Sequence, residues 1–119
     1  MKTQKLAAIL GVAALALGAC GGKDKSGGGK GDYTACLVSD SGGWDDKSFN
    51  QSAKEGLDKA VKDLGVKSKT AESKTDSDFT RNVEGMVGEN CNLVMGVGFK
   101  LSDAISASAK DNADINYSL

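Results

Sequence analysis

Short apolar runs alternate along this chain with longer segments whose apolar residues recur at helical spacing. The short runs suit strands buried in a sheet, and the run at 91–97, with the sequence CNLVMGV, is the clearest of them. Strands are therefore expected at residues 35–38, 66–71 and 91–97 and from residue 115 onward. The apolar stripes between them predict helices at residues 49–64, 79–87 and 101–110.

This order of strand and helix predicts an α/β fold with a parallel, doubly wound sheet, because parallel strands need helical crossovers and those crossovers are right-handed. The half-polar run at 66–71 is expected near a sheet edge. The first helix should end at Gly65, a residue suited to the C-terminal cap. We expect Asp45 or Asp46 to cap the start of this helix, and Asp76 or Ser77 to cap the second one.

The N-terminus has the pattern of an export signal with a lipid attachment site. Lys2 and Lys5 precede an apolar run of 14 residues at 6–19, too short for the roughly 20 residues that span a bilayer. The run ends in LGAC at 17–20, which looks like a lipobox, with Cys20 as the acylated residue. A buried helix that ends by chance in a cysteine is the alternative.

The segment that follows favours the lipid anchor over the buried helix. Residues 21–32 read GGKDKSGGGKGD, without one apolar side chain, which suits a flexible tether. We therefore expect a signal peptide at 1–19, a lipid-anchored tether at 20–34 and an α/β lobe at 35–119. The protein is then exported and held on the extracytoplasmic face of the cell membrane.

Composition excludes several kinds of function. Without residues 1–19 the chain has 13 basic and 16 acidic residues, a net charge of −3, and Arg81 is its one arginine, so nucleic acid is not an expected partner. It has no histidine, so the common zinc and general-base arrangements are absent, and no metal or cofactor is expected. The last residues look like the opening of a strand, and we expect the chain to be part of a longer protein.

Ligands of open parallel sheets bind beyond the carboxyl ends of the strands, and two loops leave such ends here. In the first loop, Asp40 offers a carboxylate, Ser48 a hydroxyl and Phe49 an aromatic face; the alternative is that Phe49, which also starts the apolar stripe of the helix, belongs to the core. Trp44 in this loop is either a lid or a rim residue. In the second loop, Gly98 could let the backbone approach a ligand closely.

The first loop does not fit a phosphate or catalytic site. It lacks the Gly-Lys-Ser/Thr ending of a phosphate loop, and its three carboxylates would repel a phosphate. Neither Ser41 nor Ser48 has a histidine to activate it as a nucleophile. No catalytic residue is expected. The features suit a neutral, flat, polar ligand.

Three segments carry a resemblance to a known family. DSGGxDDKSFNQ at 40–51 followed by Gly56, NLVxGVGF at 92–99 and DINY at 114–117 resemble the basic membrane protein family of lipoproteins, the purine nucleoside receptors of ABC importers. The resemblance implies a type I periplasmic-binding-protein fold, of which this chain would hold most of the N-terminal lobe and none of the second lobe. It implies a nucleoside ligand and ABC permease subunits as partners.

The resemblance also implies roles for individual residues. Asp40 would hydrogen-bond the nucleobase, Phe49 would stack on it and Ser48 would line the pocket. The protein would be a solute-binding component and not an enzyme. The alternatives are a surface signalling or adhesion lipoprotein with the same fold but no transport, and a lipid-anchored hydrolase that uses the acidic loop.

Cys36 and Cys91 could form a disulfide. They open the first and third expected strands, which are neighbours in a 2-1-3 strand order, and adjacent strands lie about 4.8 Å apart, within the Cα range of a disulfide. Export would place both thiols in an oxidising compartment. Two separately buried cysteines are the alternative.

Overall fold

The computed structural model describes residues 31–119. The expected signal peptide, most of the expected tether and Cys20 lie outside the described residues. Within them, no helix is long and apolar enough to cross a membrane.

Four parallel strands alternate with three α-helices and two 3₁₀ turns. In chain order the elements are β1 Thr34–Ser39, α1 Phe49–Leu64, β2 Lys67–Ala71, η1 Asp76–Asp78, α2 Phe79–Gly88, β3 Leu93–Val97, η2 Phe99–Leu101, α3 Ser102–Asp111 and β4 Asn116–Ser118. The strands lie in the order β2-β1-β3-β4, and each neighbouring pair is parallel. The predicted α/β class, the doubly wound parallel sheet and the edge position of the second strand are confirmed.

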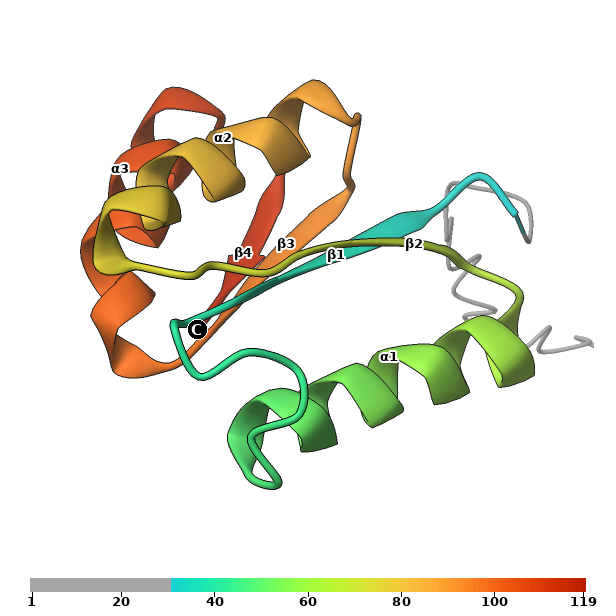
Figure 1. Ribbon diagram of the computed structural model, residues 1–119. Coiled ribbons are helices and arrows are strands. Elements are labelled where there is room, and N and C mark those ends of the chain that lie inside the picture. Colours follow the sequence, from blue (N-terminus) through green and yellow to red (C-terminus); the bar gives the residue numbers. More distant parts are fainter. Residues whose placement is uncertain (1–30) are drawn as a thin grey trace, which may run out of the picture.

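The helices form two unequal layers around this sheet (Figure 1). The chain moves from β1 to β2 through α1 on one face, then returns through α2 and continues through α3 on the other face. This split follows from right-handed crossovers, since a reversal in the direction of strand addition moves the helix to the opposite face.

The larger core lies between the sheet and the pair α2 and α3. It is made of buried apolar side chains from β1, β3, both helices, η2 and the turn before β3: Cys36, Val38, Phe79, Val83, Met86, Cys91, Val94, Leu101, Ala104 and Ile105. Gly96 lets α3 approach the sheet, because a Cβ there would lie 2.9 Å from Ile105 Cγ1.

Cys36 and Cys91 are joined by a disulfide within this core, with their Cα atoms 5.9 Å apart. Both residues are buried. The sequence pattern places Cys91 in the third strand, and this prediction is wrong: Cys91 lies in the turn before β3. The strand partner of Cys36 on β3 is Val94. The disulfide therefore joins β1 to the turn between α2 and β3.

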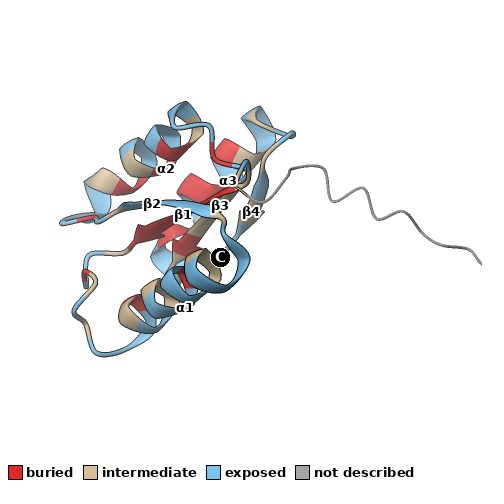
Figure 2. Ribbon diagram, turned by 90° about the vertical axis from the view of Figure 1, so that its right-hand side faces the viewer, coloured by how far each residue is buried: buried red, intermediate tan, exposed pale blue. Residues whose placement is uncertain are grey.

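The core beneath α1 is much smaller. Its buried members are Ala35, Leu37 and Leu57. In Figure 2 the helix α1 is mostly intermediate or exposed, whereas β1, β3 and the inner sides of α2 and α3 carry buried residues. The apolar stripe of α1 is thus only partly a core stripe: Phe49 is 79% exposed and Leu64 is 60% exposed.

The helix ends differ from expectation in one place. Gly65 ends α1 in the left-handed conformation with φ 69°, as predicted. The second helical segment is capped by Thr75 and Asp78, whose side chains and backbone groups form a reciprocal capping box, and not by Asp76 or Ser77. Asp76 and Ser77 fit the first turn of this segment equally well by sequence, so only the backbone geometry identifies the cap.

The beginning of the sheet also differs from the expected boundary of the tether. Thr34 is a buried residue of β1, and Tyr33 packs against the smaller core, although both fall within the tether expected at 20–34. The backbone N–H of Thr34 donates to Asn92 Oδ1 at 2.8 Å, which fixes the start of the strand.

Candidate functional site

The carboxyl ends of β1 and β3 meet at one edge of the sheet, and the two loops singled out from the sequence begin there. The pairing of these strands continues one residue beyond β1, because the backbone N–H of Asp40 donates to the carbonyl of Val97 at 3.2 Å. Asp40 and Gly98 are therefore neighbours, and α1 starts from the loop that follows Asp40.

The two oxygens of the Asp40 carboxylate have different surroundings. Oδ1 accepts the side-chain amide Nδ2 of Asn50 at 2.7 Å and the backbone N–H of Gly42 at 2.9 Å. No residue of the part that the structure describes donates a hydrogen bond to Oδ2. Asp40 is half-buried, so the structure leaves one oriented carboxylate oxygen at the edge of the sheet.

Gly98 gives room to that second oxygen. A Cβ at Gly98 would lie 2.6 Å from Asp40 Oδ2, and the backbone of Gly98 has φ 106°, a conformation that residues with a side chain rarely adopt. The sequence suggested that Gly98 lets the backbone approach a ligand. The contact seen here is with Asp40, so this glycine is needed to place the carboxylate.

Asp46 holds the start of α1. Its carboxylate accepts the backbone N–H groups of Ser48 at 2.8 Å, Asn50 at 3.1 Å and Gln51 at 3.1 Å. Desolvation acts to raise the pKa of the Asp46 carboxyl, but the hydrogen bonds from Gln51, Ser48 and Asn50 outweigh it, so the pKa lies below its ordinary value. Asp46 therefore stabilises the helix start as an anion, whereas Asp45 is exposed.

Ser48 and Phe49 stand at the first turn of α1, facing solvent. Ser48 occupies the N-cap position, yet its side chain makes no capping hydrogen bond because Asp46 satisfies the helix start instead. Phe49 is 79% exposed, which excludes the alternative that it is a core residue of the described part. An apolar ring so exposed, one residue before the Asn50 that binds the Asp40 carboxylate, is a candidate contact for a flat ligand.

Trp44 is an anchor of the first loop. It is half-buried and packs against the smaller core together with Tyr33, Ala53, Met95 and Val97. This position excludes a freely swinging lid. The loop from Asp40 to Asp46 is thus held by Trp44 at one point and by the hydrogen bonds of the two aspartates at its ends.

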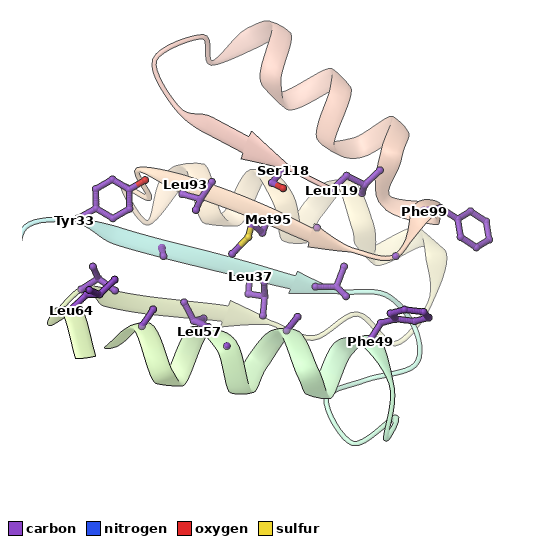
Figure 3. A pocket seen from close by; sticks show the side chains of 18 residues that line it. Tyr33, Leu37, Phe49, Leu57, Leu64, Leu93, Met95, Phe99, Ser118 and Leu119 are labelled. Atoms are coloured by element: carbon purple, nitrogen blue, oxygen red, sulfur yellow. The ribbon is translucent and has the colours of Figure 1, made fainter. Parts of the chain in front are cut away.

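Two further residues at this edge were not identified from the sequence. Asn50 lies in an amphipathic helix, where a polar side chain suggests a surface position, yet it is 1% exposed. Phe99 follows Gly98 and is 82% exposed. Figure 3 shows Phe49 and Phe99 near the carboxyl ends of the strands, with the ring of Phe99 pointing outward. The short connection at Gly98 between the third strand and the following helix could have indicated that Phe99 lies at this edge.

A long apolar trough of about 780 Å³ lies between α1 and the sheet (Figure 3). It runs from Tyr33, Leu64 and Leu93 to Phe49 and Phe99, and Leu37 and Met95 form its floor. The trough meets the polar candidate site at its Phe49 end. We place the candidate site at that end, because Phe49 and Gly98 line it and the Asp40 carboxylate lies against Gly98.

The side chains at this edge can form hydrogen bonds and stacking contacts with a ligand. Within residues 31–119 no cluster of three or more cysteine or acidic side chains is placed to hold a metal ion. Asp40 Oδ2 can accept a hydrogen bond, the Ser48 hydroxyl can donate or accept one, and Phe49 can stack. The disulfide lies away from this edge, since Cys91 precedes β3 whereas the site lies beyond its carboxyl end.

The sheet order and its two helix layers define an α/β lobe with the fold found in solute-binding proteins of ABC transporter systems. A solved structure with a similar fold is that of an ABC transporter system solute-binding protein from Aeropyrum pernix K1. The TM-score is 0.65, and the match has 23% identity and covers 71% of this chain and 23% of that chain.

Residues 34–119 match the family model described as ABC transporter substrate-binding protein PnrA-like, and the chain belongs to that family. It is 40% identical over 92 residues to the ABC transporter nucleoside-binding protein BmpA of Lactococcus lactis subsp. cremoris (strain MG1363), covering 74% of this chain and 26% of that protein. It is 37% identical over 113 residues to the CD4+ T-cell-stimulating antigen of Listeria innocua serovar 6a (strain ATCC BAA-680 / CLIP 11262), covering 87% of this chain and 32% of that protein.

The family and the fold class expected from the sequence are confirmed by these matches. The chain spans about a quarter to a third of the length of these two curated relatives. The family is one of substrate-binding proteins of ABC transporters and is not a class of enzymes.

Proposed function

We propose that this chain is the nucleoside-contacting lobe of a lipid-anchored solute-binding protein that delivers purine nucleosides to an ABC importer. Membership of the substrate-binding family and the nucleoside-binding relative in Lactococcus lactis support this proposal. The observation that carries it is the exposed ring of Phe49 at the start of α1, where the next residue, Asn50, holds the carboxylate of Asp40.

The proposed contacts use the groups at the carboxyl edge. Phe49 stacks on the base, and Asp40 accepts a hydrogen bond through Oδ2 from an N–H or hydroxyl of the ligand. The Ser48 hydroxyl lines the same pocket, and Gly98 keeps the carboxylate in place. Purines are the expected class, because the larger two-ring base gives more stacking area on an exposed phenylalanine.

Ligand-dependent stability tests this function. The complete reading frame that contains these residues is heated with adenosine, guanosine or inosine, and with cytidine or ribose as comparison. A ligand that binds only the native state at 100 times its Kd adds about 2.7 kcal/mol to the free energy of unfolding. We expect stabilisation by the purine nucleosides and loss of it in Phe49→Ala.

Absence of stabilisation by every nucleoside would contradict the proposal. A surface signalling or adhesion role would then be the better explanation of the same fold. Substitution of Val83 by Ala serves as the matched control. Val83 is buried in the larger core on the other face of the sheet, so this change weakens the lobe without loosening α1 or touching the proposed contacts.

The anchor is proposed at Cys20. A multi-chain lipid on this residue would hold the protein at the membrane, since each buried methylene contributes about 0.8 kcal/mol. Growth with radiolabelled palmitate should label the wild-type protein and leave Cys20→Ser unlabelled and released from the membrane fraction. Labelling of Cys20→Ser would refute this site.

A further inference from the structure

Asn50 is polar and almost fully buried. It is 1% exposed, although it lies in the first turn of α1, which is otherwise the most exposed helix of the described part. Its side-chain Oδ1 is buried without a hydrogen-bond partner among the residues described. Burial of an unsatisfied acceptor costs stability. An amide at this position therefore needs an explanation other than the folding of the helix.

The one side-chain hydrogen bond of Asn50 is made to Asp40. The amide Nδ2 donates to Asp40 Oδ1 at 2.7 Å, and this contact determines the orientation of the amide, because the reverse orientation would place two oxygens face to face. A hydrogen bond to an ionised carboxylate is among the stronger ones in proteins.

This bond decides which carboxylate oxygen is free. Asn50 and the backbone N–H of Gly42 both approach Asp40 Oδ1, and Oδ2 is turned toward Gly98. Without Asn50, the backbone N–H of Gly42 alone would hold the carboxylate, and rotation about the side chain would exchange the two oxygens.

The same bond also ties two elements together. Asp40 follows β1, and Asn50 follows Phe49 in α1, so the contact fixes the carboxylate relative to the exposed aromatic ring. Asp46 holds the backbone of this helix turn, including the N–H of Asn50 at 3.1 Å. The side chain of Asn50 adds the link between the turn and the strand end.

We propose that Asn50 is a positioning residue of the ligand site, which orients Asp40 so that Oδ2 receives the ligand and sets the spacing between this oxygen and Phe49. The proposal rests on the proposed function, nucleoside binding through Asp40. Asn50 itself does not touch the ligand, because it is buried beneath the loop.

A double-mutant cycle on the complete reading frame tests this role, with adenosine and guanosine as probes in calorimetry. Asn50→Ala should raise Kd about 10-fold or more in the wild-type background. In the Asp40→Ala background the same substitution should change Kd less than about twofold, because the group on which Asn50 acts is gone. Asn112→Ala is the matched control: this half-buried amide donates to the Ser108 carbonyl at the end of α3 and should leave Kd unchanged.

The outcomes separate the inference from the proposed function. A wild-type protein that binds neither nucleoside overturns the proposed function and the inference with it. A wild-type protein that binds, together with an Asn50→Ala effect that is absent or equal in both backgrounds, overturns the inference alone and leaves the proposed function standing.

A second measurement does not depend on the folding of an Asn50 variant. In protein labelled with ¹⁵N at asparagine, the side-chain amide protons of Asn50 should exchange slowly in the wild type and at least about tenfold faster in Asp40→Ala, because loss of the acceptor frees them. Fast exchange in the wild type, or equal exchange in both proteins, would overturn the inference.

Discussion

Substitution of Gly98 by Ala should distort the ligand edge and destabilise the lobe. The added Cβ would lie 2.6 Å from Asp40 Oδ2 and 3.1 Å from its Cγ, so the carboxylate must move. The backbone at φ 106° adds strain of about 1–3 kcal/mol for a residue with a side chain. Displacement of Asp40 would also weaken its hydrogen bonds to Asn50 and Gly42, each of about 1 kcal/mol or more.

Together these effects predict a loss of about 2–4 kcal/mol in the free energy of unfolding. Urea denaturation of residues 20–119 measures it, followed by the fluorescence of Trp44, the single tryptophan of the chain. Gly56→Ala is the matched control. A Cβ at Gly56 meets nothing within 4 Å, and alanine favours the interior of a helix, so this variant should be more stable by about 0.5–1 kcal/mol.

The two glycine variants should therefore shift the urea midpoint in opposite directions. In the complete protein, Gly98→Ala should also weaken nucleoside binding, whereas Gly56→Ala should not. Equal midpoints for Gly98→Ala and wild type would show that Asp40 does not occupy the position described, and the account of the site would have to be abandoned.

Four other perturbations test the site and the fold. Phe49→Ala should weaken nucleoside binding by about 1–3 kcal/mol through lost stacking, and Asp40→Asn by about 1.5–3 kcal/mol through a lost charge-assisted bond; unchanged affinity of both in calorimetry would mean that the site lies elsewhere. Cys36 and Cys91 are 55 positions apart, and the chain-entropy estimate for a disulfide that closes such a loop is about 4 kcal/mol. Reduction of this disulfide should therefore lower the free energy of unfolding by about 4 kcal/mol, measured by urea denaturation with and without reductant. Full alkylation of both thiols in the mature protein without reductant would exclude the bond. Asp46→Ala should lower the urea midpoint at pH 7, and the gap to wild type should close as the pH falls below about 4, because a depressed carboxyl pKa stabilises the fold only while the group is ionised; a gap that is constant with pH would contradict capping by the anion.

The fold could be predicted because its signals are local. Each strand is a short apolar run and each helix carries its own stripe, so chain order and the right-handed crossover rule suffice to build the sheet. A cysteine at the start of an apolar run looks like the first residue of a strand, but Cys91 lies in the turn between α2 and β3.

The site could be predicted only as a set of residue types at one edge. Periodicity placed Phe49 at the head of a core stripe, but burial depends on what covers the opposite side of the trough, which sequence spacing does not contain. The burial of Asn50 depends on how the loop that begins at Asp40 folds over the first turn of α1. The contact between Gly98 and Asp40 joins residues that lie far apart in the chain. Such contacts are a product of strand register, so they appear only when the sheet is assembled.

The small number of buried apolar side chains in α1 has a consequence for motion within the lobe. Leu57 is its single buried apolar side chain, whereas α2 contributes Phe79, Val83 and Met86 to the larger core. Local opening costs least where few apolar contacts break, so α1 should detach from the sheet more often than its neighbours and exchange its amide hydrogens sooner. Phe49 moves with this helix. A ligand that contacts both Phe49 and Asp40 would therefore hold α1 against the sheet and make its detachment rarer.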